Sequence, residues 1–223
     1  LKRVFGDISS NKDESESKTK ARLPEDFRLL CTANDKQAFI AKKYLERRGV
    51  LKSDIAKYKV GISNVYPFSN RIIFPSFDEN LELNFFLSRT YDSSEKIKYK
   101  NCKNSKKEII FNENLINWKK RLIIVEGVFD AIKAGKNSVC MLGSWIDESF
   151  LLFQKIVKNR TPVTLVPDPD ARSKAQKIAK NLMSYCIDVK ITNNLEKDFG
   201  EMTKEEAQIY LNNSQQIDNT DRI

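Results

Sequence analysis

The sequence predicts an α/β fold in which a mostly parallel sheet with helices on both faces follows a smaller mixed α+β subdomain. Apolar segments such as residues 122–125 and 163–166 end close to acidic residues, and an amphipathic stretch follows each of them. Strand and helix patterns alternate from Arg121 to Ile191, which is typical of parallel strands joined by helices. At 223 residues the chain is long enough for one large domain or two small ones.

Other parts of the chain predict the elements around that sheet. An amphipathic pattern predicts a helix over residues 35–48, with Gly49 as its stop signal. A short helix is expected after Ser53. Strands are expected at 71–77 and 82–89, joined by a turn, and a final helix at 203–212. We therefore divide the chain into four parts. Residues 1–25 are a polar linker or disordered tail, and residues 26–119 form the α+β subdomain. Residues 120–200 form the sheet domain, and residues 201–223 form a C-terminal helix and tail.

Acidic residues follow two of the apolar strands. Glu126 ends the first, and Asp168 and Asp170 follow the second. Parallel strands end at the same edge of a sheet, so these carboxylates can converge although they lie far apart in sequence. Such oxygen donors suit Mg²⁺ or Mn²⁺. The plainer alternative is that they are strand-end and capping residues, with Asp170 opening the helix that begins near Ala171. Acids at two strand ends without compensating charge favour the metal site.

The pairing of Val125-Glu126-Gly127 with Asp168-Pro169-Asp170 resembles the Toprim domain. This metal-binding fold is shared by DnaG-type primases, type IA and type II topoisomerases and some nucleases. Further segments follow the order of the DnaG-type catalytic core, so that the resemblance covers about residues 26 to 212. These segments are residues 41–49, 60–62, 70–75, 85–89, 98–101 and 196–198.

The resemblance implies a set of site residues. The implied catalytic metal ligands are Glu126, Asp168 and Asp170, and Asp198 is implied as a further metal ligand. Gly127 and Asp130 are implied to support these ligands. Those implied to bind nucleotide or DNA are Arg71, Arg89, Lys98, Asn101 and Lys107. Gly200 stands where the family tends to carry another acid, so a first metal position is implied more strongly than a second. The implied cofactor is Mg²⁺ or Mn²⁺.

Composition narrows the chemistry. The net charge of +9 indicates a polyanionic partner such as nucleic acid, although surface lysines also serve solubility. Histidine is missing from the sequence, which excludes Ser-His, Cys-His and imidazole-metal sites. The four cysteines form no C-x-x-C pair, so we expect neither a zinc site in this chain nor a disulfide framework.

The function implied by the resemblance is that of a DNA primase catalytic core, which synthesises short RNA primers on a single-stranded DNA template. Its expected partners are the template, nucleoside triphosphates and a replicative helicase. Residues 1–22 resemble the linker that follows the zinc-binding module of such primases. The alternatives are a Toprim nuclease and a non-catalytic nucleic-acid-binding module. No membrane span or signal peptide is visible, so a cytoplasmic location is expected, in a host cell if the protein is phage-encoded.

Overall fold

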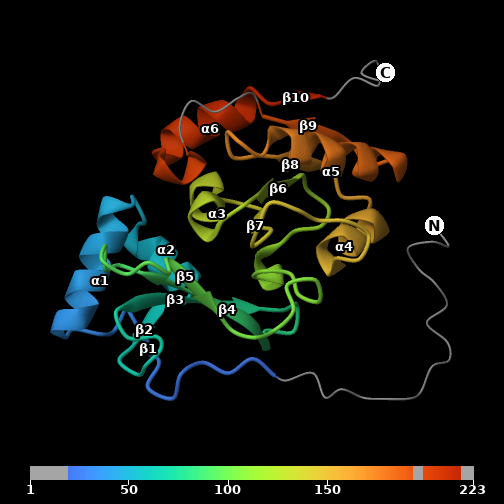
Figure 1. Ribbon diagram of the computed structural model, residues 1–223. Helices are drawn as coiled ribbons and strands as arrows, with labels where there is room; N and C mark the ends of the chain where they lie inside the picture. Colours follow the sequence, from blue (N-terminus) through green and yellow to red (C-terminus); the bar gives the residue numbers. More distant parts are fainter. Residues whose placement is uncertain (1–19, 193–197, 217–223) are drawn as a thin grey trace, which may run out of the picture.

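A computed structural model describes residues 20–192 and 198–216, which form two five-stranded sheets flanked by helices (Figure 1). The first sheet is antiparallel, and its strands lie side by side in chain order. These strands are β1 (Arg28–Leu29), β2 (Gly61–Ser63), β3 (Arg71–Phe77), β4 (Leu83–Thr90) and β5 (Tyr99–Asn101). The structure confirms the predicted strand pair at 71–77 and 82–89.

Two helices, α1 (Lys36–Arg47) and α2 (Lys52–Lys57), connect β1 to β2. The Asp35 side chain caps α1 by accepting a hydrogen bond from the Ala38 amide at 3.1 Å. Residues of α1 spaced three or four apart are buried against the sheet, as an amphipathic helix requires. Gly49 has a φ of +66°, the left-handed conformation that commonly ends a helix. The predicted helix and its stop signal are therefore confirmed.

The second sheet has the strand order β10-β9-β8-β6-β7. Its four strands β6 (Leu122–Val125), β7 (Ser138–Cys140), β8 (Val163–Leu165) and β9 (Val189–Ile191) are parallel, while β10 (Gln215–Gln216) runs antiparallel to β9. The connecting helices are α3 (Val128–Ala134), α4 (Leu151–Asn159) and α5 (Arg172–Ser184), and α6 (Lys204–Asn212) precedes β10. This arrangement confirms the predicted α/β class with a mostly parallel sheet.

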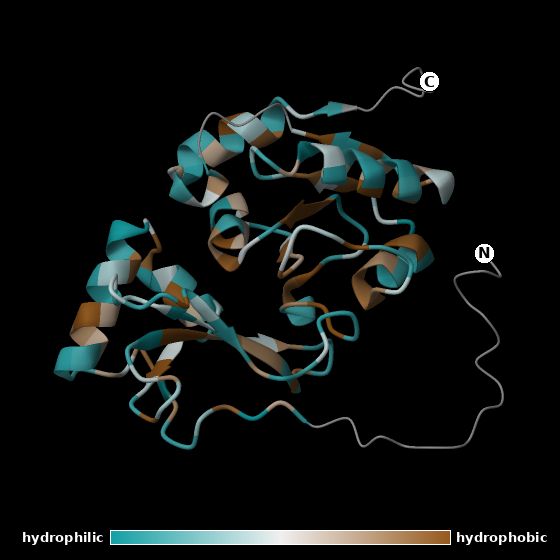
Figure 2. Cartoon of the chain, in the orientation of Figure 1, coloured by the Kyte–Doolittle hydropathy of each residue, from teal (hydrophilic) through white to brown (hydrophobic). Residues whose placement is uncertain are grey.

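Helices cover both faces of the second sheet, as predicted. Side chains of α4 and α5 form one apolar cluster with Leu122, Ile124 and Leu165, and strand β6 and much of α4 are correspondingly brown in Figure 2. Side chains of α3 and α6 pack on the opposite face, in a cluster that also contains β3 and β4 of the first sheet. The Phe74 and Phe129 rings meet there edge to face, with centroids 5.6 Å apart. One hydrophobic core therefore joins the two sheets.

Two short 3₁₀ helices complete the structure, η1 (Glu113–Leu115) and η2 (Phe199–Glu201). Of the helices in the described ranges, none combines the length and apolar character needed to cross a membrane.

Candidate active site

Parallel pairing of β6 and β8 brings two of the predicted acids together. Glu126 directly follows β6, and Asp168 lies three residues beyond β8. The ladder continues past the strands, because the Val166 amide donates to the Ile124 carbonyl at 2.9 Å. The Asp168 amide then donates to the Glu126 carboxylate at 3.3 Å. Strand register thus holds the Glu126 side chain beside the Asp168 backbone.

Two further acids, Asp130 and Asp198, lie near Glu126 and Asp168 and come from the segments around α3 and η2. Asp130 lies in the first turn of α3, where its carboxylate accepts a hydrogen bond from the Gly127 amide at 2.8 Å. Asp198 precedes η2 and accepts one from the Gly200 amide at 2.8 Å. A Cβ atom at Gly200 would lie only 2.5 Å from the Asp130 carboxylate. Glycine at position 200 therefore lets the two acidic segments approach closely.

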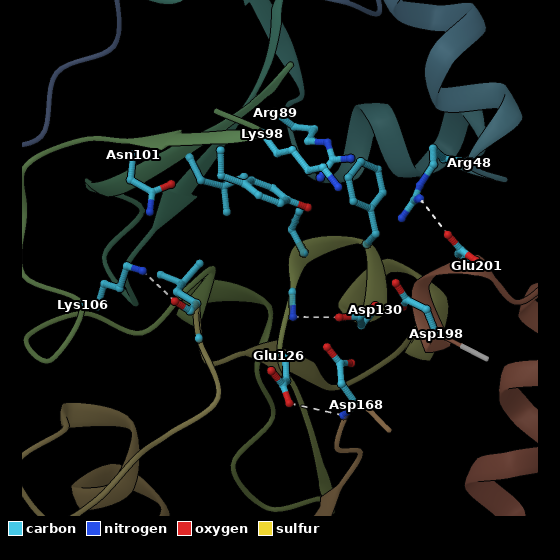
Figure 3. A pocket seen from close by; sticks show the side chains of 17 residues that line it. Arg48, Arg89, Lys98, Asn101, Lys106, Glu126, Asp130, Asp168, Asp198 and Glu201 are labelled. Atoms are coloured by element: carbon cyan, nitrogen blue, oxygen red, sulfur yellow. Dashed lines mark hydrogen bonds and ion pairs between the residues drawn. The ribbon is translucent and has the colours of Figure 1, made fainter. Parts of the chain in front are cut away.

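These acids line a cavity of about 450 Å³ between the two sheets. Figure 3 shows the acids on the second sheet's side and basic side chains facing them from the first sheet and the end of α1. The charged and amide residues that line the cavity are Arg48, Arg89, Lys98, Asn101, Lys106, Glu126, Asp130, Asp168, Asp198 and Glu201. The cavity therefore has one acidic wall and one basic wall.

Burial and mutual repulsion raise the pKa values of three of these acids. Burial, followed by Asp198 and Asp168, raises the pKa of Asp130 to about 7, even though the bond from the Gly127 amide opposes this shift. The pKa of Glu126 is raised by burial and by Asp168, and that of Asp168 by burial and by Asp198. The acids therefore repel one another in the absence of a cation.

The sequence matches no protein-family model and no curated protein. The structure, however, is similar to solved primase structures. A DnaG catalytic core gives a TM-score of 0.66 at 20% identity, covering 82% of this chain and 75% of that one. A DnaG primase catalytic domain bound to single-stranded DNA gives 0.64 at 17% identity, covering 82% and 74%. The RNA polymerase domain of Mycobacterium tuberculosis primase DnaG, with double-stranded DNA carrying an overhang, gives 0.66 at 15% identity, covering 84% and 77%.

The chain has the fold of the DnaG primase catalytic core. Most of the site residues predicted from the DnaG resemblance line the cavity of this fold. Glu126, Asp168, Asp198, Gly127 and Asp130 lie on its acidic side. The predicted basic and amide residues Arg89, Lys98 and Asn101 lie on the other side. The Arg89 guanidinium is held by the Tyr44 hydroxyl at 3.1 Å and lies over the Tyr99 ring.

Three predicted site residues, Asp170, Lys107 and Arg71, lie outside the cavity lining. Asp170 is exposed, although it is close enough to act on the pKa values of Glu126 and Asp168. The Lys107 ammonium lies 5.6 Å from the centre of the Phe150 ring. The preceding residue, Lys106, reaches the cavity instead and donates to the Leu142 carbonyl at 2.7 Å.

Arg71 requires a correction, because it does not face the acids of the DnaG-like cavity. It pairs with Thr90 in the sheet, whereas its neighbour Ile72 pairs with the cavity residue Arg89. Side chains alternate between the faces of a strand, so Arg71 lies on the far face. Its guanidinium is only 2% exposed and donates to the carbonyls of Ile97 at 2.7 Å and Lys98 at 3.3 Å. Arg71 therefore positions the backbone that carries Lys98.

Four charged or polar residues that line the cavity were not predicted from the sequence: Arg48, Tyr99, Lys106 and Glu201. Arg48 caps the C-terminus of α1, with its guanidinium 4.6 Å from the Phe129 ring centre and 3.7 Å from the Glu201 carboxylate. The adjacent arginines before Gly49 were the available signal, because cations are favoured near the C-terminus of a helix. Nothing in the sequence singled out Glu201.

The carboxylate oxygens of the acids in the cavity are the type of ligand that Mg²⁺ and Mn²⁺ prefer. Among the described residues, no three acidic, histidine or cysteine side chains converge on one point, so the acids are spread along one wall of the cavity. The capping alternative is not supported for Asp170, because Ala171 is the N-cap of α5 and no side chain caps that helix. A cation bound in the cavity would reduce the repulsion among these acids.

The raised pKa values predict that the metal-free protein loses stability as the pH rises. An acid whose pKa is higher in the folded state than in the unfolded state disfavours folding once it ionises. For Asp130 the loss should develop from about pH 4, the ordinary value, to about pH 7. Thermal unfolding at about pH 5 and about pH 8 checks this, and Mg²⁺ or Mn²⁺ should raise the melting temperature more at the higher pH.

The Asp130→Asn variant is the control for this pH dependence. Asparagine can still accept the bond from the Gly127 amide, but it does not ionise. The variant should therefore be stabilised at the higher pH and should lose less stability between the two conditions. An identical pH profile for the variant and the original protein would contradict the assignment to Asp130.

Proposed function

We propose that this chain is the catalytic core of a DNA primase, which joins ribonucleotides into short primers on a single-stranded DNA template. The observation that carries the proposal is the cavity between the sheets, where an acidic wall, with Asp130 buried and Glu126 and Asp168 half-buried, faces a basic wall in a DnaG-like fold. This division of charge suits nucleotidyl transfer, which depends on positioning and charge neutralisation more than on covalent chemistry by the protein.

The acidic wall is proposed to hold Mg²⁺ or Mn²⁺. Glu126 and Asp168 are the proposed catalytic ligands, and Asp198 and the exposed Asp170 complete the acidic set. A bound divalent ion would supply Lewis acidity, lowering the pKa of a primer 3′-hydroxyl and offsetting charge on the reacting phosphate. Asp130 is proposed to position the Gly127 turn through its hydrogen bond, which in turn orients Glu126.

The basic wall is proposed to bind the phosphates of the nucleotide and the template. Arg89 and Lys98 extend from the first sheet, Lys106 from the segment after it, and Arg48 from the end of α1. Arginine can bind phosphate oxygens in pairs, and lysine acts as a compact charge. Asn101 can donate and accept hydrogen bonds from the same side of the cavity. We propose that residues 26–119 mainly bind the substrates and residues 120–200 mainly hold the metal.

The proposed macromolecular partner is single-stranded DNA, with nucleoside triphosphates as substrates and a replicative helicase as a further partner. One similar DnaG structure contains single-stranded DNA and another contains double-stranded DNA. The net charge of +9 supports binding to a polyanion.

Primer synthesis on a defined template tests the proposal. The purified protein is incubated with single-stranded DNA, labelled ribonucleotides and Mg²⁺ or Mn²⁺, both with and without a supplied primer. Incorporation of ribonucleotides supports the proposal. Cleavage of DNA without incorporation would indicate a Toprim nuclease, in which the same acids act on water. DNA binding without either reaction would indicate a non-catalytic module.

Affinity for single-stranded DNA is expected to fall steeply with salt, because binding releases counterions from the phosphates. Lys98→Met should weaken binding and reduce the slope of log affinity against log salt by about 0.7, the value for one lost contact on a single strand. Fluorescence anisotropy over a salt series measures both quantities. Lys177→Met is the matched control, because this exposed lysine lies on α5, across the second sheet from the cavity, and should leave the slope unchanged.

A further inference from the structure

A second cavity, of about 520 Å³, lies between the end of α1, helix α3 and the start of α6. It shares only Arg48 and Glu201 with the catalytic cavity, and Figure 3 shows this ion pair at the edge of the first site. Its other charged residues are Arg47, Lys133, Lys204 and Glu205. Four cationic side chains and two acidic ones therefore surround the cavity, which leaves an excess of positive charge.

Lys133 is the unusual member of this group. Its side chain lines the cavity, yet the residue is only 3% exposed. Among the described residues, the structure provides its ammonium with one acceptor, the Gly49 carbonyl at 3.3 Å. An ammonium has three donors, and a buried charge is unfavourable unless it is paired and hydrogen-bonded. Lys133 thus has donor capacity that the described protein groups do not use.

Two acids, Asp54 and Glu205, lie near enough to act on the pKa of Lys133, but among the described residues neither is hydrogen-bonded to its ammonium. The Lys204 ammonium is held by both carboxylate oxygens of Asp54 at 2.8 Å, so that acid already has a partner. The Arg48 guanidinium lies 3.7 Å from Glu201, and its buried Nε atom has no hydrogen-bond partner among the described atoms. Burial together with Arg48 and Lys204 lowers the pKa of Lys133, which places these cations close to it. An anion in the cavity would supply the Lys133 ammonium with a further acceptor.

Two backbone features of the cavity favour binding of a phosphate group. The first turn of α6, with Thr203 as its N-cap, lines the same cavity, and a helix N-terminus attracts anions through its backbone amides and partial positive charge. Two acids in this turn, Glu205 and Glu206, offset part of that charge. Gly49 also lines the cavity, and a Cβ there would lie 2.3 Å from the Lys133 ammonium. The glycine therefore leaves room for the ammonium at the cavity wall.

We propose that this cavity is a second anion site, which binds a phosphate group of a small ligand between Lys133, Arg47 and the first turn of α6. The ligand is either free pyrophosphate or the polyphosphate of a nucleotide. The inference goes beyond the proposed primase activity and does not depend on it, since the site contains none of the proposed metal ligands and requires no catalysis.

Binding of pyrophosphate and of ATP, each without divalent metal and in the presence of chelator, tests the site by isothermal titration calorimetry. The decisive variant is Lys133→Met, which keeps the length of the side chain but removes its charge. It should weaken binding about tenfold or more, the effect of one lost charge-assisted hydrogen bond. Lys136→Met is the matched control, since it removes the same charge from an exposed residue outside the cavity lining and should bind normally. The tighter of the two ligands identifies the source of the phosphate.

A second variant makes the opposite prediction. Glu205→Gln removes an exposed acid from the cavity wall and should tighten binding of the same ligand several-fold, because a repelling charge has gone. Circular dichroism checks that both variants fold. Equal binding by Lys133→Met and the original protein would overturn the proposal and leave Lys133 as a structural partner of the Gly49 carbonyl. A lack of binding of both ligands by the original protein would overturn it as well.

Discussion

Replacing Asp168 with asparagine is expected to reduce primer synthesis about a thousandfold, because it removes one charge from the acidic wall that we propose to hold the metal. Asparagine has nearly the same size as aspartate, and the hydrogen bond to Glu126 comes from the backbone amide of residue 168, which the change retains. Folding should therefore persist. DNA binding should be kept or strengthened, since an acid has left a cavity that also contains cations.

The measurement is primer synthesis and DNA affinity on the same purified variant, with circular dichroism to confirm the fold. Glu126→Gln should show a comparable loss of synthesis. Asp92→Asn is the matched control, because it makes the same change at an exposed turn outside the cavity lining. Near-normal synthesis by folded Asp168→Asn and Glu126→Gln proteins would show that these carboxylates are not catalytic ligands.

Replacing Phe74 with alanine is expected to lower the free energy of unfolding by about 3 to 5 kcal/mol, the usual cost of truncating a buried phenylalanine. Its ring is fully buried in β3 and packs against Phe129 of α3, whose helix also carries Asp130. The vacated space would weaken the contact between the two sheets. The basic and acidic walls of the cavity should then be held less accurately, so primer synthesis should fall together with stability.

Denaturant unfolding measures this effect, and Phe39→Ala is the matched control. Phe39 lies on α1 with 61% of its surface exposed, so its truncation should change the free energy of unfolding by no more than about 0.5 kcal/mol. Equal losses for the two variants would contradict the role of Phe74 in joining the sheets.

Elements with strong local signals could be predicted from the sequence. The helix α1 is specified by its Asp35 cap, its apolar spacing and Gly49, each of which acts within a few residues. The strands β3, β4 and β6 have recognisable apolar patterns, and β8 was recognisable because its apolar run extends beyond the strand to Val166. The strands β1, β5 and β10, of two or three residues each, were not predicted. Their pairing depends on a neighbouring strand rather than on their own sequence.

The positions of the site residues could be predicted where those residues directly follow the end of a strand. Glu126 and Asp168 were placed correctly beside each other because parallel strands in one sheet end at one edge. The positions of basic residues were harder to predict, since the face that a residue occupies depends on strand register and on the path of a loop. Arg71 therefore lies on the far face, and Lys106 lines the cavity instead of Lys107.

The sequence by itself determined the α/β order of elements and the acids at the ends of β6 and β8, because strand and helix periodicity is encoded locally and strands that alternate with helices are typical of a parallel sheet. Only the tertiary structure showed that Arg48 and Lys106 join the predicted Arg89 and Lys98 opposite those acids. Arg48, Arg89 and Lys106 come from three separate segments, and packing of the two sheets around Phe74 and Phe129 brings them to one cavity. Long-range packing of this kind depends on the fit of side chains from distant segments, which no local pattern specifies.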